Sequence, residues 1–447
     1  MLRKYIFTLL VTILSLSLAG AALAAGGPPT DILKGVFTEI QAPTRSVVFV
    51  KDGTTESRIL TLGAKMELSK LQINKKVMVS LDKHAGEGVI KSVDIMFMDM
   101  TLKKMISLIV VGLIGGLLSG FIGSGGAFVM TPAMMSLGVP GAVAVACNMC
   151  HKFPKAMVGA YKRYKYGQAD IKLGLVMGIT AVIGVQIGIE IQKYILAQFG
   201  NAGSNLYVSA VFMVVLIFVG GYVLADAYKL SQSKNSEAPV SKLALRMQSI
   251  ELWPMMEFKV AKVRISAWIT VPVGLLTGML AATIAVGGFI GVPGMIYVVG
   301  ASAVVASATE LIVAFVMGAW GSVQWGWSGL IDIRLTLLLL AASLIGVQLG
   351  ALGTTYVKDY MIKVVMATTM LIVAVSRGVM VPGYLAAVGW RPALAPEMST
   401  LLENISYWAL VGALGSAGLI ITVAMIKGMS ADRAERNAKL SHAVNHG

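Results

Sequence analysis

The sequence predicts an all-α polytopic membrane protein with an inverted internal repeat and broken half-helices, preceded by a small N-terminal extracytoplasmic β domain. Three observations predict this fold. The chain is 56% hydrophobic and only 13% charged, whereas soluble domains carry about 25% charged residues. An apolar leader is followed by short runs of strand-like composition. The remaining chain copies itself at an offset of 162 positions, so that Gly125-Gly126 returns as Gly287-Gly288, and such repeats commonly build transporters.

The first expected element is a signal peptide over residues 1–25. Arg3 and Lys4 form a short basic region, an apolar run follows from Tyr5 to about Ala19, and residues 22–24 supply an Ala-Leu-Ala cleavage site. An uncleaved anchor helix is the alternative. Both interpretations place the following residues outside the cytoplasm.

Residues 26–98 are expected to form a small extracytoplasmic β-barrel or a sandwich, with an OB-like barrel as one form. Turn signals at Asp52-Gly53 and Ala85-Gly86 separate the strand-like runs, and no residue cluster in this region indicates catalysis. The runs cover residues 35–40, 46–50, 76–81 and 88–93.

The rest of the chain consists of apolar segments that are about as long as a bilayer is thick, roughly 20 residues each. Two shorter apolar pieces, near 126–138 and 288–300, each follow a glycine pair and are expected to be half-helices or broken helices. Full spans are expected near 102–122, 141–162, 170–194, 205–228, 265–285, 302–322, 330–353, 361–378 and 404–426.

Loop charges predict the orientation of each repeat. Residues 161–166 form the most basic short loop, which is therefore expected in the cytoplasm. The matching loop at 323–328 carries tryptophans in place of the basic residues, as expected if the second repeat is inserted upside down with this loop outside. A parallel duplication whose loop charges drifted is the alternative.

The expected order is therefore a first transmembrane repeat, a cytoplasmic linker, a second repeat, and a final transmembrane helix with a basic cytoplasmic tail. These parts cover residues 99–228, 229–264, 265–391 and 392–447. The protein is then a multi-pass protein of the cell inner membrane. Because its basic residues sit mainly in loops and the tail, the net charge of +15 reflects orientation and no nucleic-acid partner is expected. No P-loop, G-x-S-x-G or H-E-x-x-H motif indicates an enzyme, and no cofactor is expected.

The glycine-rich turns and the residues after them resemble the sulfite exporter (TauE/SafE) family of membrane transporters. The first copy has the turn at 123–126, then Pro132 and the helix entry Gly138-Val139-Pro140, and the second has Gly287-Gly288, Pro293 and Gly300. The resemblance covers roughly residues 105–380. It implies transport of small sulfur-containing anions, such as sulfite or sulfonates, without ATP hydrolysis. The implied partners are this substrate and the lipid bilayer, with a homodimer left open.

Glycine pairs are the first candidates for the anion site. Each pair begins a half-helix, whose N-terminus carries roughly half a positive charge and favours an oxyanion. Gly125, Gly126, Gly287 and Gly288 would supply this in pseudo-symmetric positions. The alternative is that these glycines only allow close helix packing. Gly112, inside an ordinary span, is expected to tolerate alanine.

Polar residues near the middle of the span at 141–162 are the second set of candidates. Lys152 could neutralise the anion, and His151 could carry a coupled proton, since its reference pKa is about 6.5. Lys155 is expected to reach the cytoplasmic surface. Asn148 has Glu310 as its counterpart in the second copy, and this carboxyl could pair with Lys152 or carry a proton.

Three further readings remain open. Gln186 and Gln348 are counterparts in the two repeats and either bind ligand oxygens or bridge helices. Cys147, Cys150 and His151 share one helix face and could form a soft-metal site for a copper carrier, although no metal is expected. A membrane-anchored binding or sensor protein, with the β domain as its ligand-binding part, is the third reading.

Overall fold

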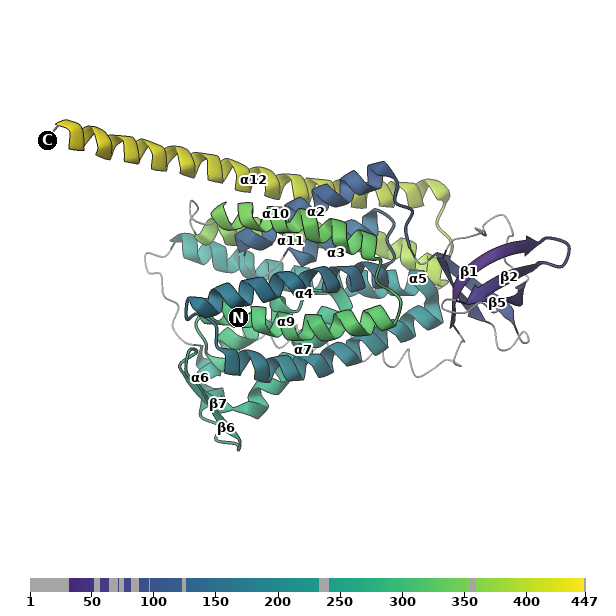
Figure 1. The fold of residues 1–447 in the computed structure, drawn as a ribbon, viewed down its shortest axis with the longest axis horizontal. Helices are drawn as coiled ribbons and strands as arrows, with labels where there is room; N and C mark the ends of the chain where they lie inside the picture. The colour runs from purple at the N-terminus through teal and green to yellow at the C-terminus, as the bar shows by residue number, and fades with distance from the viewer. Residues whose placement is uncertain are drawn as a thin grey trace.

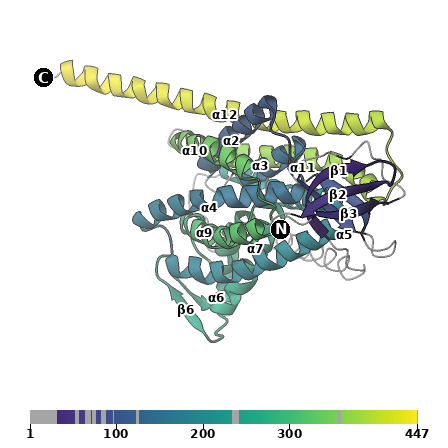
Figure 2. The same cartoon turned by 45° about the vertical axis from the view of Figure 1, so that its right-hand side comes forward.

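The computed structural model describes residues 32–51, 57–63, 71, 76–81, 88–95, 97–122, 126–232, 241–353 and 359–445. The predicted signal peptide and Gly125 lie outside the described residues. A small β-barrel lies at one end of a bundle of long helices, and the C-terminal helix projects from the other end (Figures 1 and 2). The helical membrane fold with a small N-terminal β domain is confirmed.

The barrel closes in the strand order β1-β2-β3-β5-β4, with β1 paired to both β2 and β4 and with β3 parallel to β5. This is the order of an OB-like barrel, so the barrel form of the prediction is confirmed. The Phe37 and Phe49 rings meet edge to face in its core, with centroids 5.8 Å apart. The strands are β1 Ile32–Gln41, β2 Ser46–Lys51, β3 Ser57–Leu62, β4 Lys76–Leu81 and β5 Val89–Ile95. Strand β3 was not expected, because its exposed face makes its apolar pattern weak.

Seven helices of the described chain are long and apolar enough to cross a membrane, so this is a multi-pass membrane protein. One of them, α5, breaks at Gly200, where φ is 62°, and so provides two spans. The 25-residue α4 carries more polar residues. The long helices are α2 Leu102–Ile122, α4 Gly141–Lys165, α5 Ile171–Gln232, α7 Ala267–Ile284, α9 Ala303–Trp327, α10 Ile333–Gly353, α11 Asp359–Val388 and α12 Pro396–Asn445.

Two short apolar helices confirm the predicted half-helices. They are α3, Ala127–Ser136, and α8, Gly288–Gly294, which continues into the π-helical turn Met295–Val299. Each is too short to cross a bilayer alone, since an α-helix rises about 1.5 Å per residue.

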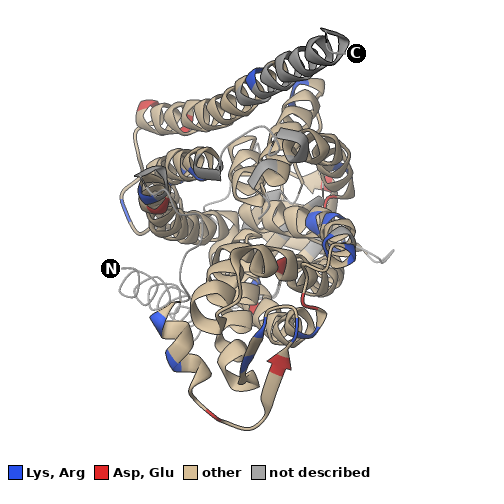
Figure 3. Cartoon of the chain, turned by 90° about the vertical axis from the view of Figure 1, so that its left-hand side faces the viewer, with Lys and Arg blue, Asp and Glu red and all other residues tan. Residues whose placement is uncertain are grey.

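The predicted linker contains regular structure that was not expected. Its described part holds the short helix α6, Lys242–Gln248, and a hairpin of β6, Met255–Phe258, and β7, Val263–Ser266. Figure 3 looks onto this end of the bundle, where charged residues are coloured on the short helix, the hairpin and several helix ends. The backbone N–H groups of Val260 and Ala261 in the hairpin turn donate to the carboxylate of Asp170, which precedes α5.

The counterpart helices α4 and α9 pack against each other in opposite directions. Gly321 lies against Met149, Gly318 against Phe153, and Gly159 against Leu311. The loop after α4 therefore lies at the α6 end of the bundle, and the loop after α9 lies at the barrel end. An inverted repeat requires this antiparallel arrangement. Its orientation relative to a membrane stays a prediction.

The repeats interlock through backbone contacts at glycines. A Cβ atom at Gly278 in α7 would lie 1.9 Å from the Ala181 carbonyl oxygen in α5, and one at Gly116 in α2 would lie 2.4 Å from the Ser343 oxygen in α10. The two contacts are equivalent under the repeat, because Gly278 and Ser343 lie 162 positions after Gly116 and Ala181. Because no side chain fits, glycine is required at both crossings.

Glycines on the opposing helices complete the same two crossings. A Cβ at Gly184 would lie 2.0 Å from the Leu275 oxygen, and one at Gly346 would lie 2.1 Å from the Leu113 oxygen. Gly112 also lies on this contact, where a Cβ would come 2.8 Å from the Cβ of Ala342. The expectation that Gly112 tolerates alanine is therefore wrong, because the helices would have to shift.

Gly278→Ala should destabilise the protein strongly, because the added methyl group collides with the backbone of α5. Gly221→Ala is the matched control: no other atom lies within 4 Å of its Cβ position, and alanine stabilises an open helical site by about 0.5–1 kcal/mol relative to glycine. Thermal unfolding of the purified variants in detergent measures both. Equal unfolding temperatures for Gly278→Ala and the wild type would contradict the interlock.

Candidate functional site

The two half-helices meet by their N-terminal turns inside the bundle. Phe128 and Phe289, each the second residue of its helix, have ring centroids 5.5 Å apart. Neither N-cap residue, Gly126 or Gly287, supplies a side-chain cap. The first backbone N–H groups of a helix have no intrahelical partner and carry partial positive charge. Two uncapped first turns therefore lie close together through their phenylalanine rings.

The glycines that begin the half-helices provide close packing. A Cβ at Gly126 would lie 1.8 Å from the Gly115 oxygen in α2, and one at Gly287 would lie 2.9 Å from the Thr277 oxygen in α7. Gly115 and Thr277 are themselves counterparts. Gly288 is buried. Gly126 and Gly287 thus allow close helix packing, as the alternative interpretation proposed. A contact between their backbone and an anion stays a prediction.

Asn148 on α4 holds the first half-helix. Its fully buried side chain donates from Nδ2 to the Ala127 oxygen at 2.9 Å and to Thr131 Oγ1 at 2.7 Å. Within the described residues, its Oδ1 has no hydrogen-bond partner. One side of this amide thus fixes α3, and the other side remains free to bind a donor.

His151 lies one turn further along α4 and is fully buried. Its Nδ1 lies 2.8 Å from the Asn148 carbonyl oxygen, so Nδ1 must donate. In the neutral ring, Nε2 is then an acceptor, and no partner for it occurs in the described part of the chain. The geometry presents a bare imidazole nitrogen inside the bundle.

Glu310 on α9 is the counterpart of Asn148 and contacts the second half-helix. A Cβ at Gly291 in α8 would lie only 2.1 Å from the carboxyl Oε2, so the carboxyl group rests on the α8 backbone. Glu310 is 4% exposed, and neither carboxyl oxygen has a hydrogen-bond partner among the described residues. Counterpart positions therefore contact both half-helices, one with an amide and the other with an acid.

Lys152 and Lys155 have different surroundings on α4. Lys152 is half-buried and lies within electrostatic range of Glu310, but no ion pair joins them in the described chain. Lys155 donates from Nζ to Ser119 Oγ on α2 at 3.1 Å. Between them, Phe153 stacks on its counterpart Phe315, with ring centroids 5.5 Å apart. Of these two lysines, Lys152 is the one that remains available to a ligand.

The two predicted glutamines lie away from this group. The Gln186 Oε1 accepts from Trp320 Nε1 at 3.1 Å and its Nε2 donates to Glu190, on an exposed part of α5. Gln348 is exposed on α10. The structure does not bring either glutamine to the half-helices, and we leave both out of the site.

A symmetric pair of hydrogen bonds that the sequence did not indicate fixes α4 and α9. The Asp332 N–H lies 3.2 Å from Cys147 Sγ, and the Asp170 N–H donates to Thr309 Oγ1 at 3.0 Å. Cys147 and Thr309 are counterparts, as are the two aspartates. The recurrence of Asp-Ile at 170 and 332 was the signal in the sequence, but its role depends on contacts across the repeats.

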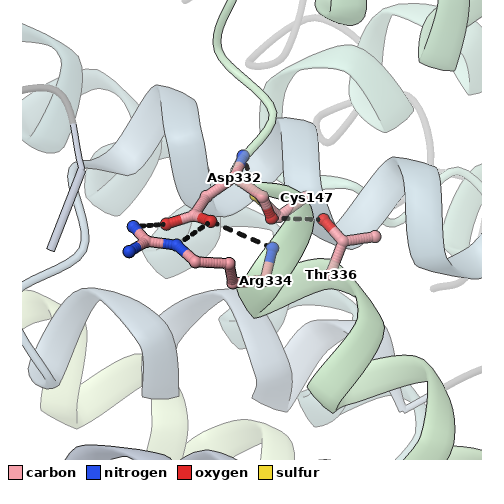
Figure 4. A network of polar contacts seen from close by, with 4 residues as sticks. All are labelled: Cys147, Asp332, Arg334 and Thr336. Atoms are coloured by element: carbon pink, nitrogen blue, oxygen red, sulfur yellow. Dashed lines mark hydrogen bonds and ion pairs between the residues drawn. The ribbon is translucent and has the colours of Figure 1, made fainter. Parts of the chain in front are cut away.

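Figure 4 shows how Asp332 uses its remaining groups. Its carboxylate accepts from Arg334 Nε at 3.1 Å and Nη2 at 2.9 Å, and its carbonyl oxygen accepts from Thr336 Oγ1 at 2.9 Å. Cys147 thus belongs to a structural network. The described residues contain no group of three or more histidine, cysteine or acidic side chains that could hold a metal ion.

Comparison with known proteins identifies the family. Residues 108–377, more than half of the chain, match the profile described as Sulfite exporter TauE/SafE. The chain belongs to this family. It is also similar to the "Probable membrane transporter protein YdhB" of Bacillus subtilis (strain 168), with 23% identity over 254 residues that cover 56% of this chain and 89% of the relative. No solved structure matches the chain.

Membership of the TauE/SafE family confirms the resemblance predicted from the glycine turns. The matched region runs from α2 to the later part of α11. It contains both half-helices, α4 and α9, and leaves out the β-barrel and α12. The candidate site residues thus lie within the region shared with the family, and this chain has additional elements on either side.

Cys147→Thr should preserve stability, because threonine already accepts the equivalent hydrogen bond at position 309. Cys147→Val has the same shape without the acceptor and leaves the buried Asp332 N–H unpaired, at a cost of about 1–3 kcal/mol. Thermal unfolding in detergent compares the two variants. Equal stability of Cys147→Thr and Cys147→Val would show that the sulfur is not a structural acceptor.

Proposed function

We propose that this TauE/SafE transporter moves small sulfur-containing oxyanions, such as sulfite or organosulfonates, by secondary transport and exports them. The family's description names sulfite export. The observation that carries the proposal is the meeting of two half-helix N-termini inside the bundle without side-chain caps. Such N-termini bind oxyanions through backbone N–H groups without permanent countercharge.

The polar groups around the half-helices supply the rest of an anion site. Lys152 adds a positive charge that strengthens the binding of a sulfite or sulfonate group, and Asn148 holds α3 so that its first turn keeps its direction. A mid-membrane lysine costs on the order of 3 kcal/mol, and an anion beside it offsets part of that cost. The buried phenylalanines exclude water and strengthen the electrostatic attraction.

Glu310 and His151 are the proposed proton carriers. A carboxyl group pressed against α8 can exist as a neutral acid that needs no counter-ion, or as an anion that competes with substrate for Lys152. Proton binding at Glu310 and substrate binding at Lys152 would then be linked. The Nε2 of His151, which has no partner among the described residues, offers a second acceptor on α4.

The barrel end of the bundle is proposed to face the outside. The signal peptide would deliver the barrel there, and the basic loop after α4, the linker and the tail would lie in the cytoplasm. The antiparallel α4 and α9 would then belong to inverted repeats. Alternating access would come from movement of the interlocked helix pairs around the half-helices.

Lys152→Ala should abolish the uptake of radiolabelled sulfite into proteoliposomes, because the anion loses its countercharge. Lys155→Ala should be milder, since Lys155 bonds to Ser119. Uptake of Cu(I) by the wild type, measured in the same proteoliposomes, tests the alternative function of a copper carrier. Uptake of Cu(I) without sulfite or organosulfonate uptake would overturn the proposed substrate class.

Glu310→Gln should remove the dependence of sulfite transport on a pH gradient while retaining sulfite–sulfite exchange, because the amide cannot carry a proton. Glu190→Gln is the control, since Glu190 is an exposed carboxylate on α5. Counterflow and gradient-driven uptake are compared in the same liposomes. Retention of gradient dependence by Glu310→Gln would assign the coupling to another group.

Single cysteines at Lys165 and Trp327, in a Cys147→Thr, Cys150→Ala background, should react with impermeant thiol reagents from opposite sides of the membrane. Both positions are exposed at opposite ends of the bundle. The reaction of each cysteine is compared between intact cells and inverted vesicles, which expose opposite sides of the membrane. Reaction from the same side would contradict the inverted repeat.

A further inference from the structure

One arginine is buried inside the bundle where the first half-helix ends. Arg377 on α11 is 1% exposed. Its Nη2 donates to Ser136, the last residue of α3, and to Ser406 Oγ on α12 at 2.7 Å, and it lies 3.4 Å from Ser376 Oγ. One guanidinium nitrogen thus reaches hydroxyl groups on three helices.

The rest of this guanidinium lacks a charged partner. Nε and Nη1 have no hydrogen-bond partner in the described part of the chain. Other cations have carboxylate partners, such as Arg334 with Asp332 at 2.9 Å and Lys363 with Asp226 at 2.6 Å. A buried cation without a counter-ion costs several kcal/mol. A bound anion would offset that cost.

The groups around Arg377 suit an oxyanion. Three serine hydroxyls lie around Nη2, and the neutral Tyr384 phenol lies close enough to hydrogen-bond to the guanidinium. Hydroxyl groups can donate to an anion, and a guanidinium fork binds the paired oxygens of an oxyanion group bidentately. Glu403, also within range of Tyr384, is exposed and forms no bond with Arg377.

The repeat symmetry shows that the fold does not require polar groups here. At the offset of 162 positions, Arg377, Ser376 and Ser136 correspond to Val215, Val214 and Val298. Val215 is fully buried. The corresponding positions in the other half therefore carry valines, so the arginine and the serines are particular to this half.

The cluster lies beside the barrel end of the bundle. A cavity of about 480 Å³ opens there, and its lining includes Met135, Gly138, Phe97, Lys104 and Asn205. Met135 and Gly138 flank the end of α3, whose last residue, Ser136, bonds to Arg377. Arg377 and the cavity thus share the end of one half-helix.

We propose that Arg377 binds the transported oxyanion at a second subsite, at the barrel end of α3. This rests on the proposed function and adds a residue that recognises the substrate away from Lys152. The phosphate of an anionic lipid offers the same chemistry. Because the Arg377 side chain is covered by α12 and its neighbours, a small free anion reaches it more readily than a headgroup attached to acyl chains.

Sulfite binding to the purified full-length protein tests this subsite. In isothermal titration, Arg377→Gln should raise the Kd for sulfite about tenfold or more, and Arg377→Lys should raise it less, because lysine keeps the charge without the fork. Lys363→Gln, on the same helix but with a carboxylate partner, should bind like the wild type. Equal affinity of Arg377→Gln and the wild type would overturn the subsite.

Thermal unfolding separates binding from a structural role. Without sulfite, Arg377→Gln should unfold at or above the wild-type temperature, because an unpaired buried charge has been removed. Sulfite should raise the unfolding temperature of the wild type more than that of Arg377→Gln. If Arg377 only joins α12 to α3 and α11, the variant would unfold earlier with unchanged affinity, which would refute the proposal. Should Arg377→Gln not fold, unchanged affinity in Arg377→Lys would refute it.

Two further outcomes are distinguishable. A wild type that binds neither sulfite nor an organosulfonate overturns the proposed substrate class, and this subsite with it. Stabilisation of the wild type, but not of Arg377→Gln, by phosphatidylglycerol alone would assign Arg377 to a lipid phosphate and overturn the transport subsite.

Discussion

Close backbone contact between the two repeats is the constraint on which the rest of the structure depends. At Gly116 and Gly278, helices of opposite repeats approach so closely that a methyl group would overlap a carbonyl group. Lipid offers little hydrophobic drive for helix association, so such contacts supply dispersion energy that bulky interfaces cannot. The helices α4 and α9 pack against each other through glycines of their own, and Asn148 and Glu310 on this pair contact the two half-helices.

The proposed site lies where counterpart residues differ. Asp170 and Asp332 play the same role in both halves, bonding through their N–H groups to Thr309 and Cys147. By contrast, Asn148 faces α3 with an amide where Glu310 faces α8 with an acid. Lys152 and Arg377 have alanine and valine as counterparts. Symmetric residues thus maintain the scaffold, whereas the cations and the carboxyl group that we propose for substrate binding differ between the two halves.

Several elements were predictable because membrane solvation limits the choices. Long apolar segments must become helices, since lipid cannot satisfy backbone hydrogen bonds, and glycine pairs marked the starts of α3 and α8. The exposed strand β3 and the structured linker were missed because their apolar patterns are short. Gln186 and Gln348 recur in the repeats, yet the structure leaves both away from the half-helices. They were predicted as site residues because sequence recurrence does not reveal which side of a helix points inward.

The sequence by itself determined the membrane class, the repeat, the broken helices and the family, because these follow from composition and local periodicity. Only the tertiary structure decided which polar residues meet. Asn148 reaches Ala127 across 21 positions, whereas Arg377 reaches Ser136 across 241. Such contacts depend on which helices cross and on which faces, and that is decided by the packing of backbones at glycines. Cys147, which the sequence offered only as an alternative metal ligand, serves as a hydrogen-bond acceptor for the opposite repeat.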